Sequence, residues 1–317
     1  MKLALIALFA VGCTAKPASD DSPATDDSPA VEEPAWPEGL AELSELSSGE
    51  CPDMSASGTV SFTSSGEART VTVVRPDVVD SDTAVVVFFH GLMSPSQTPN
   101  PTEYMAEGLG LQDLADDNNV IVLLPESGQR TEFGQTFYLF DVEGTSDHDI
   151  VLYDDLRTCV AALEPNMARM SAMGFSGGAL FTTLIASQRG DTLASIVEMS
   201  GGADLDVVIS ESTVAAYSTP AYDFPALLAS GGSTDRWPSP SIAIVDFEAG
   251  SDTLEHHLVS DGHLVVRCHH DQGHTITNAE FALAQQWVLQ HTFGQPSPWA
   301  SGDLGSDSSW CAMGVAE

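Results

Sequence analysis

Gly174-Phe175-Ser176-Gly177-Gly178 is the stretch that decides the fold of this chain. Residues 170–173 before it are predicted to form a short strand, and the apolar run 178–186 after it is predicted to begin a buried helix. The pentapeptide fits the G-x-S-x-G pattern, in which a tight strand-to-helix turn exposes the serine Oγ and leaves no room for a Cβ at the flanking glycines. Because a chain rich in Gly and Ser can produce this pattern by chance, a catalytic role for Ser176 depends on partners elsewhere.

The N-terminus has the pattern of an export signal. Met1 and Lys2 precede an apolar run, residues 3–12, that is too short to span a bilayer. Residues 10–13 resemble the lipobox of bacterial lipoproteins, although Ala10 stands where that family more often has Leu. The resemblance implies that Cys13 is diacylated and anchors an exported protein at the outer cell surface or in the periplasm. The alternative is an ordinary secretory signal, from which Cys13 is removed and the protein becomes extracellular.

The composition divides the rest of the chain into a tether and one domain. Residues 14–50 are dominated by Ser, Asp, Pro, Ala, Thr and Glu, which bury too little apolar surface to offset the chain entropy of folding. We therefore expect a flexible tether there. Residues 51–317 contain no second linker of this kind, which favours one large α/β domain and a monomer.

The charge of the chain excludes several classes of partner. The formal net charge is -36, and both lysines, Lys2 and Lys16, precede the expected domain, which holds the eight arginines. Such a surface disfavours nucleic acid and anionic lipid, so a membrane would be reached only through a lipid on Cys13. No spacing of Asp and Glu resembles a calcium loop, and we expect neither a metal nor an organic cofactor.

The domain alternates short β-branched runs with longer helical patterns, which is typical of a mostly parallel sheet covered on both faces. Eight strands are predicted, at 59–63, 70–75, 84–89, 120–124, 170–173, 195–199, 226–230 and 263–267. Helices are predicted at 102–117, 148–163, 177–189, 240–260 and 278–292. The fold class expected from this order is the α/β-hydrolase fold.

A serine nucleophile needs a base to take its proton and an acid to orient that base. Asp235 follows the strand at 226–230 and is the favoured acid. Asp204, after the strand at 195–199, is the rival, although it also fits as the cap of a short helix at 205–210. His274, just before the last helix, is the favoured base, and His269 and His270 are its competitors. The order Ser176, Asp235, His274 is that of the α/β-hydrolases.

The reaction also needs backbone N–H donors for the oxyanion. Gly177, at the start of the helix after the elbow, is the first expected donor. The second is expected from the loop after the strand at 84–89, where the turn His90-Gly91 would bring the N–H of Leu92 or Met93 toward Ser176.

Four segments together carry a more specific resemblance. They are Phe88-Phe89-His90-Gly91, Tyr153-Asp154-Asp155-Leu156-Arg157, Gly174-Phe175-Ser176-Gly177-Gly178 and Gly273-His274-Thr275-Ile276. The region 58–293 thereby resembles the polyhydroxybutyrate depolymerase and feruloyl esterase branch of the α/β-hydrolases. The resemblance implies a secreted serine carboxylesterase that acts on polyhydroxyalkanoates, on feruloyl or acetyl esters of polysaccharides, or on smaller esters. The chain departs from the branch at Trp237-Pro238, where many members have an apolar residue and Pro.

Four further cysteines, Cys51, Cys159, Cys268 and Cys311, favour two disulfides in an exported protein, with three possible connectivities. If the fold is right, Cys51 and Cys159 lie on the same side of the sheet, which leaves Cys268 and Cys311 for each other. The stretch 126–147 follows the fourth strand, at the edge where α/β sheets bind ligands, and its bulky residues can line an acyl pocket or pack against the sheet rim. These residues are Phe133, Phe137, Tyr138, Leu139 and Phe140.

The leading hypothesis is therefore an ester hydrolase whose substrate is possibly polymeric. A serine peptidase on the same fold is the second enzymatic hypothesis, and a surface protein that uses the fold only for binding is the non-enzymatic one. None of the residues needed for catalysis is missing, which disfavours the binding protein.

Overall fold

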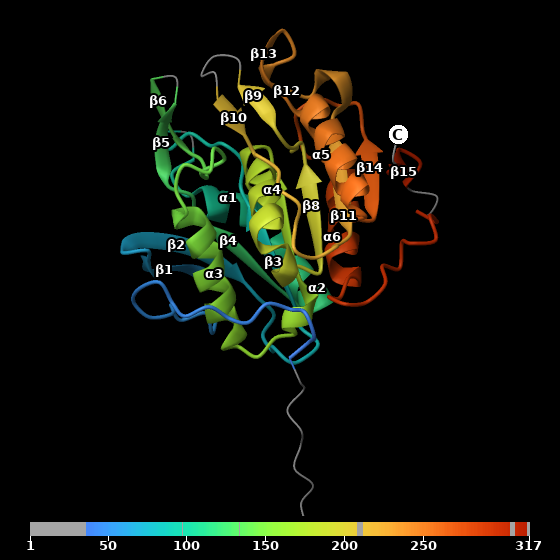
Figure 1. Ribbon diagram of the computed structural model, residues 1–317. Helices are drawn as coiled ribbons and strands as arrows, with labels where there is room; N and C mark the ends of the chain where they lie inside the picture. Colours follow the sequence, from blue (N-terminus) through green and yellow to red (C-terminus); the bar gives the residue numbers. More distant parts are fainter. Residues whose placement is uncertain (1–35, 97, 133, 208–211, 305–307, 316–317) are drawn as a thin grey trace, which may run out of the picture. The chain divides into compact units, whose positions relative to one another are not determined.

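The computed structural model describes residues 36–96, 98–132, 134–207, 212–304 and 308–315 (Figure 1). Its centre is a nine-stranded sheet. In spatial order the strands are β1 (Gly58–Ser64), β2 (Glu67–Val74), β4 (Val120–Pro125), β3 (Ala84–Phe89), β7 (Met170–Phe175), β8 (Ser195–Met199), β11 (Ala226–Ser230), β14 (Val265–His269) and β15 (Cys311–Met313). The strands from β4 to β14 are parallel, and antiparallel pairs stand at the two edges. This is the predicted α/β-hydrolase fold with one strand, β15, more than the sequence predicts.

Helices cover both faces of the sheet. One layer contains α3 (His148–Ala161), α4 (Gly177–Arg189) and α5 (Phe247–Asp261), and the other contains α1 (Pro101–Gly108), α2 (Leu111–Asn118) and α6 (Asn278–Gln290). Strand β3 shows why two cores form: Val85, Val87 and Phe89 pack into one, and the alternating Ala84, Val86 and Phe88 into the other. Side chains alternate along a strand, so an entirely apolar strand serves both faces.

Three short 3-10 helices accompany these elements. They are η1 (Met167–Arg169), η2 (Gly190–Thr192) and η3 (Gly232–Thr234).

Three hairpins extend beyond the carboxyl ends of the parallel strands, at the top of Figure 1. They are β5 (Gln129–Glu132) with β6 (Gln135–Tyr138), β9 (Leu205–Val207) with β10 (Ser212–Val214), and β12 (Arg236–Ser239) with β13 (Ile242–Asp246). The sequence analysis predicts none of them. They rise around the edge of the sheet where a ligand of this fold binds.

The structure corrects three of the expected helices. The helix predicted at 240–260 begins only at Phe247, because residues 242–246 pair with β12. The helix predicted at 102–117 is two helices, since Gly110 adopts a left-handed φ of 63° between them. The short helix considered at 205–210 is wrong as well, because β9 occupies residues 205–207.

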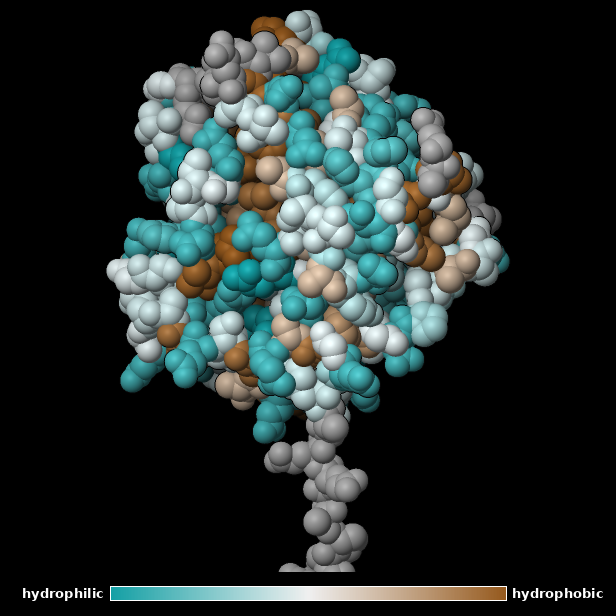
Figure 2. All heavy atoms as spheres, in the orientation of Figure 1, coloured by the Kyte–Doolittle hydropathy of each residue, from teal (hydrophilic) through white to brown (hydrophobic). Residues whose placement is uncertain are grey.

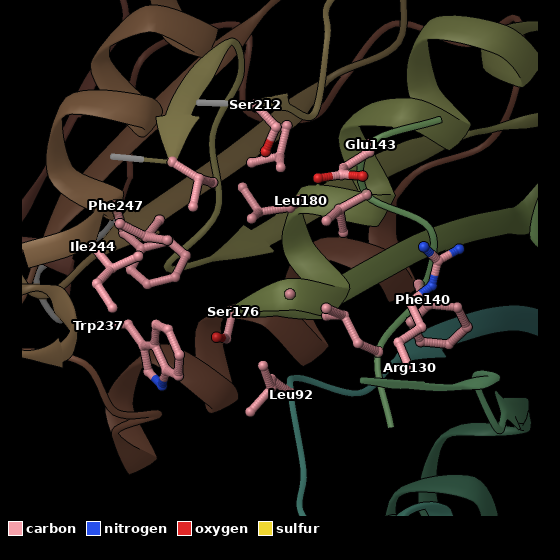
Figure 3. Close-up of a pocket in the computed structure, with 16 residues that line it drawn as sticks. Leu92, Arg130, Phe140, Glu143, Ser176, Leu180, Ser212, Trp237, Ile244 and Phe247 are labelled. Atoms are coloured by element: carbon pink, nitrogen blue, oxygen red, sulfur yellow. The ribbon is translucent and has the colours of Figure 1, made fainter. Parts of the chain in front are cut away.

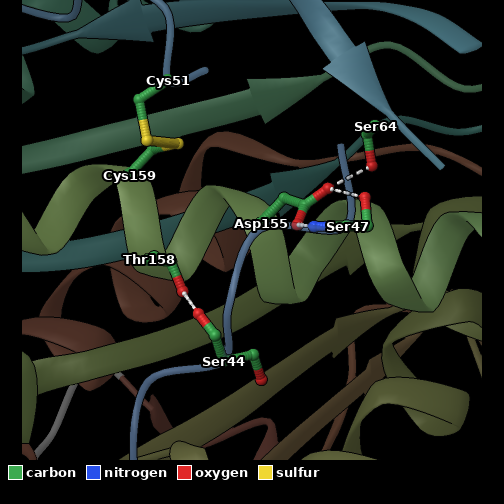
Figure 4. The surroundings of a disulfide bond; sticks show 7 residues. All are labelled: Ser44, Ser47, Cys51, Ser64, Asp155, Thr158 and Cys159. Carbon is green, nitrogen blue, oxygen red and sulfur yellow. Dashed lines mark hydrogen bonds between the residues drawn. A yellow bond between two sulfur atoms is a disulfide. The ribbon is translucent and has the colours of Figure 1, made fainter. Parts of the chain in front are cut away.

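The expected tether ends earlier than predicted. Residues 14–35, like the expected signal 1–13 and Cys13, lie outside the described residues, but residues 36–50 pack onto the domain. Leu40 is buried in the core, and the Ser47 N–H and Oγ donate to the Asp155 carboxylate over 2.8 and 2.5 Å (Figure 4). Arg157 donates to the carbonyls of Ala41 and Glu42. A few apolar and hydrogen-bonding side chains thus fix a segment whose overall composition is that of a disordered chain.

Both disulfides of the expected pairing are present. Cys51–Cys159 joins the N-terminal segment to α3, close to the Ser47–Asp155 contact (Figure 4), and Cys268–Cys311 joins β14 to β15 across the sheet edge. The second bond shows why β15 is a strand, because Cys268 and Cys311 are register partners in the antiparallel pair. Within the ranges that the structure describes, no helix is long and apolar enough to cross a membrane.

Candidate active site

Ser176 lies at a sharp turn between β7 and α4. Its φ of 56° and ψ of -124° are those of a strained elbow. The Ser176 N–H donates to the Met199 carbonyl over 3.0 Å, and its own carbonyl accepts from the Leu180 N–H over 3.0 Å. The neighbouring strand and the first turn of the helix thereby hold the turn in place.

The glycines of the pentapeptide are required by close backbone contacts. A Cβ on Gly174 would lie 2.3 Å from the Gly178 carbonyl oxygen, and a Cβ on Gly178 would lie 2.0 Å from the Phe89 carbonyl oxygen. Both distances are far below van der Waals contact. The pattern recognised in the sequence therefore reflects how closely β7, α4 and β3 approach one another at this turn.

The structure brings His274 and Asp235 to Ser176. The His274 Nε2 lies 2.9 Å from the Ser176 Oγ, and the His274 Nδ1 lies 2.7 Å from the Asp235 Oδ1. Because a carboxylate only accepts hydrogen bonds, Nδ1 carries the proton and Nε2 is left to accept the proton of the serine hydroxyl. This is the arrangement of a nucleophile, a base and an orienting acid.

Asp235 is fully buried and remains ionised. Burial raises the pKa of its carboxyl, but hydrogen bonds from His274, from the Gly231 N–H and from the Ser200 hydroxyl outweigh burial and lower the pKa below its usual value. The rival acid, Asp204, instead accepts from the Tyr217 N–H and pairs with His257 over 2.8 Å. The geometry thus favours Asp235 over Asp204 as the partner of His274.

Two aromatic rings hold the imidazole of His274. Phe247 stacks on the ring at a centroid distance of 4.3 Å and an interplanar angle of 10°, and Phe175 stacks at 5.0 Å and 24°. The two competing histidines lie elsewhere: His269 Nδ1 pairs with Glu248 over 2.9 Å, and His270 Nε2 lies 3.4 Å from Glu280. The structure therefore places His274, and neither of its neighbours, at Ser176.

The turn His90-Gly91 fixes the direction of one peptide beside Ser176. The His90 Nε2 accepts from the Ser127 N–H over 3.1 Å, so its Nδ1–H donates to the Gly91 carbonyl over 2.7 Å. Burial lowers the pKa of His90 to about 4, which keeps the ring neutral. In a trans peptide the N–H points opposite to the carbonyl, so the Leu92 N–H points away from His90.

That N–H faces the start of α4. The Leu92 N lies 3.5 Å from the position that a Cβ on Gly177 would take, so the N–H groups of Leu92 and Gly177 are neighbours at Ser176. The Met93 N–H is already bonded to the Tyr138 carbonyl over 3.2 Å, as part of a bridge between the two residues. Of the two candidates, Leu92 is therefore placed as the second donor and Met93 is not.

An apolar pocket opens at Ser176 (Figure 3). It has an empty volume of about 720 Å³, its mouth included, and it is walled by the segments around the three hairpins. Residues from all parts of its wall are Leu92, Leu139, Leu180, Val214, Trp237 and Ile244. The charged side chains in the lining are Arg130, which pairs with Asp141 over 3.1 Å, and Glu143.

The predicted loop residues divide between pocket and core. Leu139 and Phe140 line the pocket, and Phe140 also stacks on Phe181 in the core at 4.8 Å. The Tyr138 hydroxyl donates to the Pro99 carbonyl over 2.9 Å, at the rim of the sheet. Phe133 lies outside the described residues. Figure 2 shows a largely hydrophilic face of the molecule, with hydrophobic residues visible in a hollow between the β5–β6 hairpin and α4.

Sequence reasoning missed several residues of the site. Phe247 and Phe175 stack on His274, Ser200 donates to Asp235, and Trp237 and Ile244 line the pocket. Ser200 directly follows β8, and this position at the carboxyl edge of the sheet is a signal that could have identified it. Within the described ranges, no group of three His, Cys, Asp or Glu side chains is arranged to hold a metal ion.

The sheet order, the elbow and the positions of the three side chains after their strands define the class: the chain has the α/β-hydrolase fold. It is similar in structure to native sOPH, with a TM-score of 0.64 and 17% identity, over 84% of this chain and 97% of that one. For native pOPH the TM-score is 0.63 at 15% identity, over 85% and 98% of the two chains. A structure from an analysis of two fungal esterases of Rhizomucor miehei has a TM-score of 0.50 at 15% identity, over 76% and 84%. No protein-family model and no curated protein matches the sequence.

Proposed function

We propose that this chain is a serine carboxylesterase that works through an acyl-enzyme. The observation that carries the proposal is the hydrogen-bonded series Asp235, His274, Ser176 at a strand-to-helix elbow, with Ser176 at the wall of an apolar pocket. The identity to the fungal esterase is low enough that only its fold is shared, so the proposal rests on the geometry of the site.

In the first half-reaction, the Ser176 Oγ attacks the ester carbonyl carbon while the His274 Nε2 takes the hydroxyl proton. The carbonyl oxygen becomes an oxyanion that accepts hydrogen bonds from the N–H groups of Gly177 and Leu92. The bond from carbon to the alcohol oxygen then breaks, and the leaving oxygen receives the proton from His274. The alcohol departs, and the acyl group remains bonded to Ser176.

In the second half-reaction, water replaces the alcohol. It gives a proton to His274 and attacks the acyl carbon, and the oxyanion forms again at Gly177 and Leu92. The bond between carbon and the Ser176 Oγ then breaks, and His274 returns the proton to the serine. Asp235 stabilises the imidazolium in both halves and keeps its Nε2 directed at Ser176.

The pocket supports a substrate with an apolar acyl group, because its wall is made mainly of Leu, Val, Ile and aromatic side chains. Polyhydroxyalkanoates, feruloyl or acetyl polysaccharide esters, and small esters are the candidate substrates that the sequence resemblance implies. A screen across polyhydroxybutyrate, methyl ferulate, acetylated xylan and short triglycerides would choose among them.

The first test is Ser176→Ala, assayed on a short p-nitrophenyl ester. We expect kcat to fall by about 10⁴ or more, since a nucleophile has no substitute at this position. The thermal midpoint of unfolding should be at least that of the wild type, because alanine removes no core contact. A folded variant that keeps its activity would reject the proposal, and faster hydrolysis of a matched amide than of the ester would favour a peptidase.

We also propose that the protein is exported and held at a membrane by a lipid on Cys13. Two disulfides support export, because such bonds persist in oxidising compartments. Mass spectrometry of the protein from a native host would distinguish an acylated Cys13 from a secretory cleavage that removes it.

A further inference from the structure

Two hollows meet at the Ser176–His274 pair. One is the apolar pocket described above, whose lining includes Ser176 and Gly177. The other is an open groove lined by His274, by the loop that follows it and by the region of α1 and α2. Its walls include Met93, Tyr104, Leu109, Phe175, Thr275 and Ile276.

The imidazole of His274 stands between the two hollows. Phe247, which stacks on one side of the ring, lines the pocket, and Phe175, which also stacks on the ring, lines the groove. Ser176 belongs to the lining of the pocket and His274 to the lining of the groove. The two reacting side chains therefore lie on different sides of one partition.

The order of bond making assigns a part of the ester to each side. The acyl carbon bonds to the Ser176 Oγ, whereas the alcohol oxygen must lie at the His274 Nε2 to receive its proton. We propose that the pocket holds the acyl group and that the groove binds the alcohol portion of the ester. This inference rests on the proposed function and extends it, because it names which half of the substrate each hollow selects.

The groove selects an extended, neutral and apolar alcohol. Its empty volume of about 1090 Å³ exceeds the 720 Å³ of the pocket, and its outer wall carries Tyr104, which is 64% exposed. The pocket, by contrast, is walled by three hairpins and limits the acyl group. The charged side chain in the groove lining is Glu107, and the net charge of -36 also opposes an anionic alcohol.

Two matched series of esters test this division in the wild-type protein and in two variants. The first series keeps p-nitrophenol and lengthens the acyl group from acetyl to octanoyl. The second keeps a butanoyl group and lengthens the alcohol from methanol to hexanol. Ile244→Trp fills the pocket, Tyr104→Ala removes a wall of the groove, and Val78→Ala, at a side chain that is 70% exposed and lines neither hollow, is the control.

We expect the variants to act on different series. Ile244→Trp should lower the octanoyl-to-acetyl ratio of kcat/KM about tenfold and change the hexyl-to-methyl ratio by less than about twofold. Tyr104→Ala should lower the hexyl-to-methyl ratio about fourfold, as for the loss of about one buried methylene, and leave the octanoyl-to-acetyl ratio within about twofold. Val78→Ala should leave both ratios unchanged.

The reverse pattern, or an equal effect of each variant on both series, would overturn the division. An additional wild-type substrate, a butanoyl ester whose hexyl chain ends in a carboxylate, should react more slowly than the hexyl ester, and equal rates would reject the preference for a neutral alcohol. If the wild type hydrolyses no ester of either series, the proposed function itself fails, and this outcome differs from hydrolysis without the crossed pattern.

Discussion

Ser176 adopts a backbone conformation that L-residues rarely take, and its neighbours show how the fold maintains it. The strained φ of 56° is held by one hydrogen bond to β8 and one within α4, and the residues at 174 and 178 have no Cβ. Backbone strain of this kind persists only where the surroundings over-determine the geometry, and it is concentrated at functional sites. The energy of the fold is thus used at this residue to expose one hydroxyl.

The first prediction at this scale concerns the acid. Asp235→Asn keeps the shape of the side chain but offers His274 an amide, so the imidazole can adopt the wrong tautomer and loses the charge that stabilises its protonated form. We expect kcat/KM on a p-nitrophenyl ester to fall by about 10⁴. Asp204→Asn is the matched control, because Asp204 pairs with His257 instead, and its kcat/KM should stay within about twofold of the wild type. A large loss in Asp204→Asn with a small one in Asp235→Asn would reverse the assignment.

At the scale of elements, the glycines of the elbow set the distance between β3, β7 and α4. Gly178→Ala would place a Cβ 2.0 Å from the Phe89 carbonyl oxygen, so the helix must move away from the sheet. We expect the free energy of unfolding to fall by about 3 kcal/mol or more, with loss of esterase activity. Chemical denaturation monitored by circular dichroism measures the change.

Gly128→Ala is the control for that substitution, because a Cβ on Gly128 meets no atom within 4 Å. Its stability and activity should remain close to those of the wild type. Equal stability of both variants would contradict the packing account of the elbow.

The long, periodic elements could be predicted from the sequence, and the short hairpins could not. The predicted helix at 177–189 coincides with α4, and the strand at 84–89 with β3, because both are continuous apolar segments. Strands β9, β10, β12 and β13 have three to five residues each, which is too few to show a period, and their pairing is decided by tertiary contacts. Ser176, Asp235 and His274 were accessible because each follows a strand, whereas the stacking of Phe247 on His274 depends on where α5 begins.

At the scale of the whole molecule, a buried carboxyl links stability to pH. Burial raises the pKa of Glu198 to about 8, while the Thr183 hydroxyl and the Gly202 N–H lie within hydrogen-bond distance of its oxygens. The single hydrogen of Thr183 can satisfy the Gly202 carbonyl when Glu198 carries its own proton and donates it to Thr183. The geometry therefore accommodates a neutral Glu198.

Glu198→Gln tests this linkage. Between the ordinary value of 4.5 and about 8, the folded state retains a proton that the unfolded state releases, so the free energy of unfolding falls as pH rises through this range. The glutamine can make the same hydrogen bonds without titrating, and we expect the stability of the variant relative to the wild type to increase by at least about 1 kcal/mol from pH 5 to pH 8. Urea unfolding at both pH values measures it.

Glu45→Gln, at an exposed position, is the matched control and should show no such increase. A stability difference between Glu198→Gln and the wild type that stays constant from pH 5 to pH 8 would show that Glu198 does not hold a proton in the folded protein.

The central claim, that Ser176 is a nucleophile activated by His274, is tested most directly by labelling the folded protein with a fluorophosphonate and mapping the adduct by mass spectrometry. We predict one adduct per chain, on the Ser176 Oγ, with loss of esterase activity in step with labelling and no adduct in Ser176→Ala. A folded wild-type protein that takes up no label, or that takes it up at another residue, would contradict the claim and favour a protein that uses this fold for binding.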